Sequence, residues 1–368
     1  MGRSSPASTP ADRRTVTLKQ VAAAVGCSLS VVSAVLNKAR NNTRVGPELA
    51  ARIQAAAKKL AYRSNYHARV LRTGRAHLIG VVDDRMDPVS LHRGIWGKIL
   101  GGIGVETRRH DSDVMLISHG DGERDALTRA IALLEQRQID ALLVNCLIYS
   151  DRHSEVDRAR GRVVWYPMAQ PGRHPSAAIN HEPGIREAVA HLASLGHREI
   201  LWFGHRIGGE PVLPNRKDFF DLAVKENRVE SRVLWADSPA HMKGTAEFRD
   251  SFRAVFSRHL NAGKIPTAVI VYNEMAALGV YEALAGRGLR VPQDVSVIGY
   301  DNVIADLATP PMTVVSLELP EVGRLAARLA LDPDNPAKKL VCPTKLVVRQ
   351  STGPVRRKIK PIRKALNF

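Results

Sequence analysis

From residue 78 onward the chain alternates short apolar runs with longer amphipathic segments, and this alternation constrains the fold more than any other feature. The apolar runs predict buried strands at residues 78–82, 114–118, 141–145, 163–166, 200–204, 268–272 and 295–299. Helical periodicity lies between them, over residues 95–109, 126–137, 182–195 and 275–287. Such alternation predicts parallel sheets joined by crossover helices. Because this part spans about 275 residues, more than one doubly wound sheet needs, we expect two lobes.

The N-terminal segment predicts three short helices instead. One face of the first carries the apolar residues Leu18, Val21, Ala22 and Val25. Thr17 is placed to cap this helix, and Gly26 ends it where a positive φ is usual. Ser28 then caps a second helix over about residues 29–37, and a third follows over about 47–60. Two short helices around a glycine-containing turn are typical of a helix-turn-helix, although a helical interaction domain shows the same pattern.

Positive charge is concentrated at the two ends of the chain. Residues 1–75 carry 14 Lys and Arg against 2 Asp and Glu, a net charge of +12, and residues 345–368 carry +8. The part between them has a net charge of only −2. Because Lys and Arg neutralise phosphates and release condensed counterions, the N-terminal end predicts a polyanionic partner. A solvated tail is the alternative, and it is favoured for the C-terminal basic run 356–358.

Other classes of protein find little support in the sequence. No apolar stretch approaches the ~20 residues that span a bilayer, and the polar, basic start lacks the apolar core of a signal peptide. The three cysteines are far apart without metal-ligand spacing, so we expect no metal site and a reducing cytoplasm. The glycine-rich strings at 101–104 and 206–209 lack phosphate-loop spacing, and no nucleophile is paired with a base. We therefore expect no catalytic residues and no cofactor, and we interpret His197 as a core or helix-end residue.

Several segments together resemble the lac repressor (LacI/GalR) family of bacterial transcription regulators. TLKQVAAAVG, SVVSAVLN and KKLAYRSNYHARVLRTGRAHLIGVV are similar to its DNA-binding head and hinge. INHEPGIREAVAHLASLGHREILWFG, the stretch from IPTAVIVYNEM to VIGYDN, LATPPMTVV and LVVRQSTG are similar to its effector domain. The resemblance covers nearly the whole chain. It implies a multidomain protein: a small all-α helix-turn-helix head and hinge helix, then a two-lobed α/β effector domain with parallel sheets, of the periplasmic-binding-protein type (type I).

The resemblance also implies boundaries along the chain. We expect a disordered basic tail over residues 1–14, the head over 15–62, the hinge over 63–76, the effector domain over 77–353 and a basic tail over 354–368. The chain would cross three times between lobes. The N-lobe would comprise about 77–165 and 316–342, and the C-lobe about 166–315 and 343–353.

DNA-contacting residues are implied by the same match. The helix from residue 29 would lie in the major groove, with Leu29, Ser30 and Ala34 facing base edges. Phosphates would be contacted by Thr17, Ser28, Ser33 and Asn37. A hinge helix would enter the minor groove with Asn65, Ala68 and Leu71, the leucine acting as a wedge between base steps unless it is simply an apolar linker residue. Ala34 stands where the family often has arginine, so the operator sequence does not follow from the match.

For the effector, the resemblance implies a cleft between the lobes at the carboxyl ends of the strands. The matching positions are Asp83, Asp84, Arg85, Asn145, Trp165, Arg216 and Glu274. Carboxylate, arginine and aromatic groups together suit a hydroxyl-rich ligand such as a sugar. Surface ion pairs and core aromatics are the alternatives for each residue. Glu274 is one methylene longer than the usual aspartate, so a standard hexose does not follow.

The sequence thus predicts a cytoplasmic, nucleoid-associated regulator, a repressor in the first instance, that binds a pseudo-palindromic operator as a homodimer. A small molecule in the cleft would control it by favouring one lobe arrangement, as inducer or as corepressor. The C-terminal tail lacks the leucine heptads of a tetramerising coiled coil. A transport binding protein would share the two lobes but would need export and would not carry a DNA-binding head. No membrane partner is expected.

Overall fold

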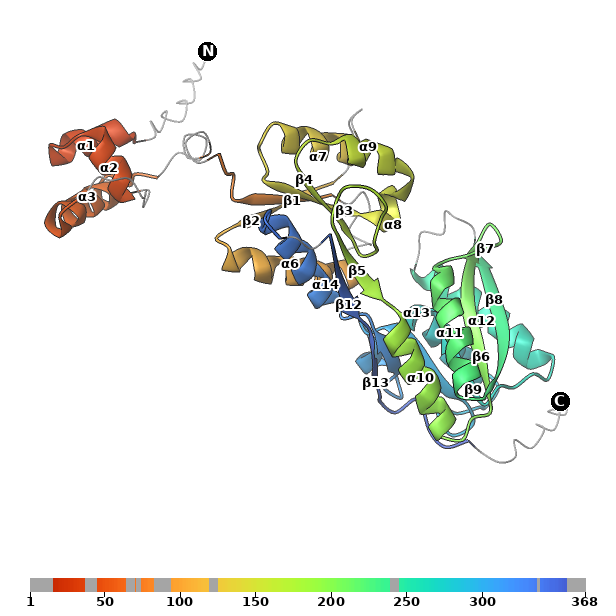
Figure 1. Cartoon of the computed structure of the whole chain (residues 1–368). Helices are drawn as coiled ribbons and strands as arrows, with labels where there is room; N and C mark the ends of the chain where they lie inside the picture. The colour runs from red at the N-terminus through yellow and green to blue at the C-terminus, as the bar shows by residue number, and fades with distance from the viewer. Residues whose placement is uncertain are drawn as a thin grey trace, which may run out of the picture. The chain divides into compact units, whose positions relative to one another are not determined.

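The computed structural model describes residues 16–36, 45–63, 70, 74–82, 94–118, 125–238, 245–335 and 338–355. The chain forms two units, Met1–Ala76 and His77–Phe368 (Figure 1). Several predicted residues lie outside the described part: Asn37, the hinge residues Asn65, Ala68 and Leu71, and the loop residues Asp83, Asp84 and Arg85. Both predicted basic tails also fall outside it, apart from residues 354 and 355.

The first unit contains the three predicted helices, α1 (Leu18–Val25), α2 (Leu29–Leu36) and α3 (Pro47–Lys59). Thr17 and Gln20 form a capping box at the start of α1, and Gly26 ends it with φ +72°. The helices close around Val21, Val32 and Ile53, which are fully buried. Arg52 of α3 donates a hydrogen bond to the Val25 carbonyl (3.2 Å), so it satisfies a group at the end of α1.

The first sheet of the second unit is entirely parallel, in the order β12-β5-β4-β3-β1-β2. Its strands are β1 (Leu78–Val82), β2 (Asp113–Ile117), β3 (Ala141–Asn145), β4 (Arg162–Tyr166), β5 (Ser176–Asn180) and β12 (Lys339–Pro343). The helices of this lobe are α6 (Ile95–Arg109), α7 (Ala126–Glu135), α8 (Cys146–Tyr149), α9 (His153–Arg158) and α14 (Leu319–Leu331), with η1 (Ser150–Arg152). Because helices cover both faces, the inner strands are continuous apolar runs, as predicted.

The second sheet has the order β13-β11-β10-β9-β6-β7, with β8 also paired to β6. Its strands are β6 (Glu199–Ile207), β7 (Glu210–Pro211), β8 (Glu230–Ser238), β9 (Ala268–Val271), β10 (Ser296–Asp301), β11 (Thr313–Ser316) and β13 (Lys345–Val347). Only the pairings of β7 and β13 are antiparallel among the described strands. The helices are α10 (Glu182–Ser194), α11 (Pro214–Glu226), α12 (Thr245–Asn261) and α13 (Glu274–Ala285), with η2 (Ala305–Leu307).

Three crossings join the two sheets: between β5 and α10, between β11 and α14, and between β12 and β13. The predicted boundary at residue 166 is too early, because β5 pairs with β4 and β12 and so belongs to the first sheet. The sequence does not predict a strand at the run SAAIN, because its small residues lack the β-branched signature. The crossings are tied together, since the Thr344 hydroxyl lies 3.0 Å from the Asn180 carbonyl.

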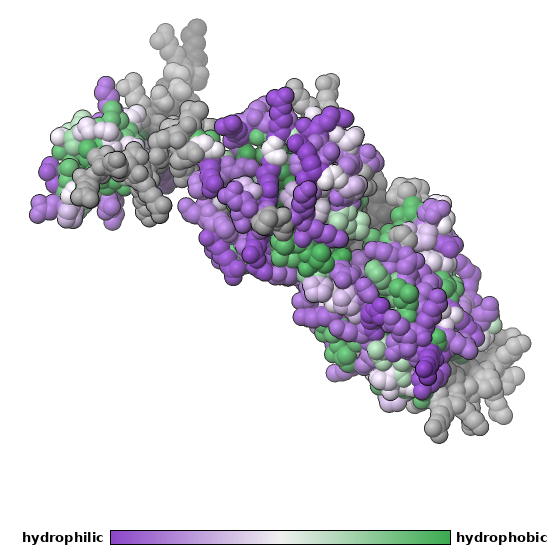
Figure 2. Space-filling model, viewed as in Figure 1, coloured by the Kyte–Doolittle hydropathy of each residue, from purple (hydrophilic) through white to green (hydrophobic). Residues whose placement is uncertain are grey.

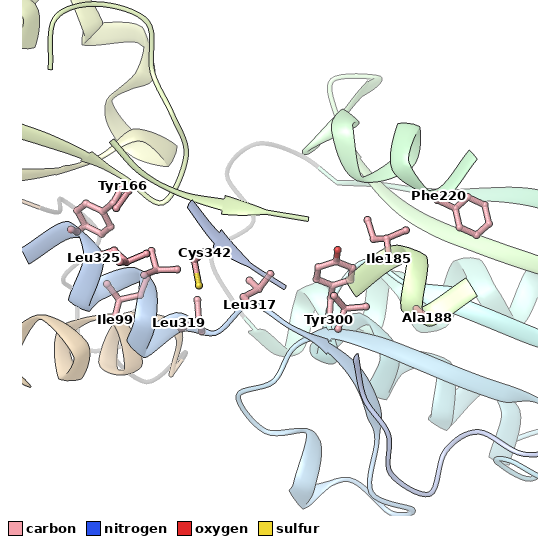
Figure 3. Close-up of a cluster of buried hydrophobic side chains, with 14 of the residues drawn as sticks. Ile99, Tyr166, Ile185, Ala188, Phe220, Tyr300, Leu317, Leu319, Leu325 and Cys342 are labelled. Carbon is pink, nitrogen blue, oxygen red and sulfur yellow. The ribbon is translucent and has the colours of Figure 1, made fainter. Parts of the chain in front are cut away.

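One apolar cluster runs through the crossings. Figure 3 shows it extending from Ile99, Tyr166 and Leu325 through Leu317, Leu319 and Cys342 to Tyr300, Ile185, Ala188 and Phe220. Hydrophilic residues predominate on the face of the molecule seen in Figure 2. Among the described helices, none alone has the length and apolar character to cross a membrane, and α1 with α2 meets that test only as a pair bent by 108°.

Candidate functional site

The start of α2 exposes its side chains. Leu29 is 48% exposed and Ser30 is also exposed, whereas Ala34, one turn later, is half-buried. Val32 on the opposite side is fully buried and fixes the helix against the core. The Ser28 hydroxyl accepts a hydrogen bond from Val31 N (3.4 Å), so the helix begins where the sequence predicts. A capped helix start with exposed side chains has the form that enters a major groove.

Two of the predicted phosphate contacts, Thr17 and Ser28, cap the starts of α1 and α2. The backbone N–H of Thr17 donates to Gln20 Oε1 (2.8 Å), and the Thr17 hydroxyl accepts from Gln20 N (3.4 Å). Ser28 lies 2.9 Å from Ser30 through their hydroxyls, and Ser33 is half-buried. Helix N-termini present backbone N–H groups that also bind phosphate. Phosphate contact by these residues stays a prediction.

Arg216 is the centre of a buried polar group in the C-lobe. It lies on α11 and is 4% exposed, and its Nη1 donates to the Tyr272 carbonyl (3.1 Å). Its Cζ lies 4.1 Å from the centre of the Tyr300 ring. Among the described residues, its Nε has no hydrogen-bond partner. A buried guanidinium keeps its charge, so an unused N–H there is costly and is suited to an acceptor on a ligand.

Three further residues of this group are not predicted from the sequence: His181, Tyr300 and Asp301. The Tyr300 hydroxyl and His181 Nδ1 are buried with no partner in the described part of the chain, and the two rings lie 5.9 Å apart. Burial raises the pKa of Asp301 to about 6, although the charge of Arg216 opposes this. Burial and Arg216 together hold the pKa of His181 well below its ordinary value. The available signal was the pair YD, which directly follows the strand predicted at 295–299, whereas His181 follows β5, which the sequence does not predict.

Glu274 is buried, but its carboxylate oxygens accept hydrogen bonds from backbone N–H groups. Oε1 and Oε2 accept from Val303 N (2.8 and 3.0 Å), and Oε2 also accepts from Ile304 N (2.7 Å). Burial raises the pKa of Glu274 to about 7 against these hydrogen bonds, which lower it. Within the described residues, no hydrogen bond or ion pair joins Glu274 to Arg216.

Asn145 and Trp165 are both buried, and each contacts other residues of the protein. Asn145 is fully buried at the end of β3, and its Oδ1 accepts from Leu147 N (3.0 Å). Trp165 is 1% exposed in the N-lobe core, where its ring stacks on His153 with 6.0 Å between centres. The structure thus brings neither residue into the group around Arg216. An effector contact by Asn145 stays a prediction, whereas the ring of Trp165 is enclosed by the core. The described residues hold no group of His, Cys, Asp and Glu suited to a metal ion.

A helix-turn-helix head followed by a two-lobed α/β domain with a buried arginine near its strand ends defines a ligand-controlled DNA-binding regulator. Residues 189–352 match the family model of the periplasmic binding protein-like domain. The chain is 29% identical to the HTH-type transcriptional regulator DegA of Bacillus subtilis, over 92% of this chain and 98% of that protein. The chain thus resembles the lac repressor (LacI/GalR) family over nearly its whole length, and the relatives it matches are transcription regulators.

Solved structures have the same fold. The crystal structure of the lac repressor dimer bound to operator and the anti-inducer ONPF matches with a TM-score of 0.72 and 23% identity, over 92% of this chain and all of that one. The complex of the transcriptional regulator CelR with cellobiose matches with a TM-score of 0.62 and 25% identity, over 91% of this chain and 99% of that one. The fold therefore agrees with the two-lobed prediction.

Proposed function

We propose that the protein represses transcription by binding a pseudo-palindromic operator as a homodimer, under the control of a hydroxyl-rich metabolite of the sugar type. The observation that carries the proposal is the buried Arg216, whose unused N–H lies in one group with Tyr300 and Asp301. The lac repressor was solved as a dimer on its operator, and CelR was solved with a sugar. Such a regulator acts in the cytoplasm, associated with the nucleoid.

In the head, the proposed contacts to base edges come from Leu29, Ser30 and Ala34. Leu29 offers an apolar surface suited to a thymine methyl, and Ser30 offers a hydroxyl that pairs with donors or acceptors. Phosphates are contacted by Thr17, Ser28, Ser33 and Asn37, and the minor groove is contacted by Asn65, Ala68 and Leu71. Two heads in a dimer would reach half-sites about one DNA turn apart.

In the effector domain, Arg216 donates to a ligand hydroxyl and Asp301 accepts from one. The Tyr300 hydroxyl and His181 supply further polar contacts from the same group. Asp83, Asp84, Arg85 and Asn145 are the proposed contacts of the N-lobe. We leave out Glu274 and Trp165, because the backbone occupies the carboxylate of one and the core encloses the ring of the other. The ligand acts by its different affinity for two lobe arrangements.

The test is selection of DNA from a random duplex pool at fixed salt by the full-length protein. Enrichment of a palindrome with a flexible central step supports the proposal, because a symmetric dimer with a minor-groove wedge requires both features. Recovery of unselected DNA, with binding that fades steeply in salt, would mean that the head binds by charge alone. Sedimentation without DNA then separates the proposed dimer from a tetramer.

A further inference from the structure

The loop after β10 is held by a buried carboxylate. Glu274 is 3% exposed at the start of α13, and it accepts three hydrogen bonds from Val303 N and Ile304 N. In the described part of the chain, no Lys or Arg forms an ion pair with it. A buried carboxylate is expensive unless its oxygens are hydrogen-bonded. These backbone groups are therefore the partners that keep Glu274 in place, and Glu274 in turn fixes the loop.

The same loop has an unusual backbone and contacts the other lobe. Asp301 and Asn302 have φ of +97° and +68°, which side-chain-bearing residues rarely adopt. Lys98 of α6, in the N-lobe, donates to the Asn302 carbonyl (2.6 Å). Arg349 donates to Asn302 Oδ1 (2.7 Å), and Asn302 Nδ2 donates to Ser316 at the second crossing (3.2 Å). Asn302 thus joins the N-lobe to a crossing and to the segment after β13.

The approach of the loop to α6 is as close as a glycine permits. Gly94 is the N-cap of α6 and has φ +68°. A Cβ at this position would lie 2.2 Å from Val303 Cγ1. The contact of Val303 with Gly94 and that of Asn302 with Lys98 lie one helical turn apart, so the first turn of α6 rests on this loop.

We propose that residues 301–304 are an interlobe latch, with Glu274 as the positioning residue that holds the latch against α6. Asp301 lies in the effector group and Asn302 contacts the N-lobe, so a ligand that moves the Asp301 backbone moves the Lys98 contact directly. The latch rests on the proposed function, in which the lobe arrangement controls DNA binding. In this proposal Glu274 does not contact the ligand. It couples ligand binding to the lobe arrangement by holding residues 301–304 in place.

The test compares Glu274→Gln and Lys98→Met in the full-length protein. Glutamine replaces one of the two accepting oxygens of Glu274 with an amide NH₂, which cannot accept. Methionine removes the Lys98 ammonium group that donates to the Asn302 carbonyl. Glu282→Gln is the matched control on the same helix, where Glu282 makes a half-buried pair with Arg249, and Lys217→Met is the control for the lysine. Spin labels at Arg129→Cys and Glu247→Cys, both exposed, report the distance between lobes after Cys27→Ser. Hydrogen exchange reports the Val303 and Ile304 amides.

We expect both test variants to shift the interlobe distance distribution, while both controls retain that of the parent protein. In Glu274→Gln the two amides should also exchange about tenfold faster. Faster exchange with an unchanged distance would show that the loop is held only locally, and would overturn the latch, as would an unchanged distance in the folded Lys98→Met variant. DNA selection is a separate measurement. If no operator is selected, the proposed function is wrong. The interlobe distances of the variants still test the latch independently.

Discussion

The guanidinium of Arg216 lies over the ring of Tyr300, 4.1 Å from its centre, while the hydroxyl of that tyrosine is buried with no partner in the described structure. The ring supports the buried charge through a cation–π contact, which strengthens when water is excluded. Because the ring face is occupied by Arg216, the groups left for a ligand are polar: Arg216 Nε and the Tyr300 hydroxyl. This favours a ligand with hydroxyl acceptors over one with an aromatic face.

Arg216→Met should weaken effector binding at least tenfold and leave folding intact. The change removes a charged hydrogen bond of about 1.5–3 kcal/mol, which weakens affinity at least tenfold. It also removes a buried charge without an ion pair in the described residues, so the free energy of unfolding should not fall by the amount typical of a broken ion pair. Calorimetric titration with a panel of mono- and disaccharides checks this, with Arg290→Met as an exposed control. Equal binding by Arg216→Met and the wild type would contradict the proposed site.

Leu29→Ala should weaken binding to the selected operator while non-specific DNA binding persists. Leu29 is 48% exposed, so its truncation should change the free energy of unfolding by no more than about 0.5 kcal/mol. A lost base contact is worth about 1–3 kcal/mol, and the salt slope should stay the same because no phosphate contact is removed. Val233→Ala, another exposed apolar residue, is the control. A reduced affinity that is equal for operator and random DNA would argue against base readout by this side chain.

Much of the fold was predictable because a strand buried on both faces is a continuous apolar run in the sequence. The runs at 78–82 and 141–145 are strands buried on both faces, and both begin and end as predicted. No comparable sequence pattern predicts the group around Arg216. His181, Arg216 and Tyr300 are distant in sequence and meet only because the sheet order brings their elements together. The role of Glu274 was equally hidden, since its partners are backbone amides that any residue would present.

Gly323→Ala should destabilise the N-lobe through the contact of α14 with α6. A Cβ at Gly323 would lie 2.0 Å from the Ile99 carbonyl oxygen, so the two helices would have to separate. Such overpacking costs about 1–3 kcal/mol or more. Gly101→Ala on α6 is a matched control, because its Cβ meets nothing within 4 Å and alanine favours the helix by up to about 1 kcal/mol. Urea unfolding of both variants checks the prediction, and equal effects in the two would contradict it.

Glu274 should make stability depend on pH near neutrality. Burial raises its folded-state pKa to about 7, above the ordinary value of 4.5. Because the folded state holds this proton more tightly, the stabilising contribution is fully present below pH 4.5 and is lost as pH rises through 7. The free energy of unfolding of the wild type, relative to that of Glu274→Gln, should therefore fall between pH 5 and pH 8, by up to roughly 3 kcal/mol.

Urea unfolding at several pH values measures this difference directly. The raised pKa of Asp301 shifts stability in the same sense in both proteins, so subtraction removes most of its effect, although the two carboxyls influence each other. Glu282→Gln, which alters a half-buried side chain on the surface of the same helix, should differ from the wild type by a nearly constant amount. A difference between wild type and Glu274→Gln that is flat over this range would mean that the backbone amides hold Glu274 ionised throughout. In that case the amides of Val303 and Ile304, rather than burial, would dominate its titration, and the loop would be held equally firmly at every pH tested.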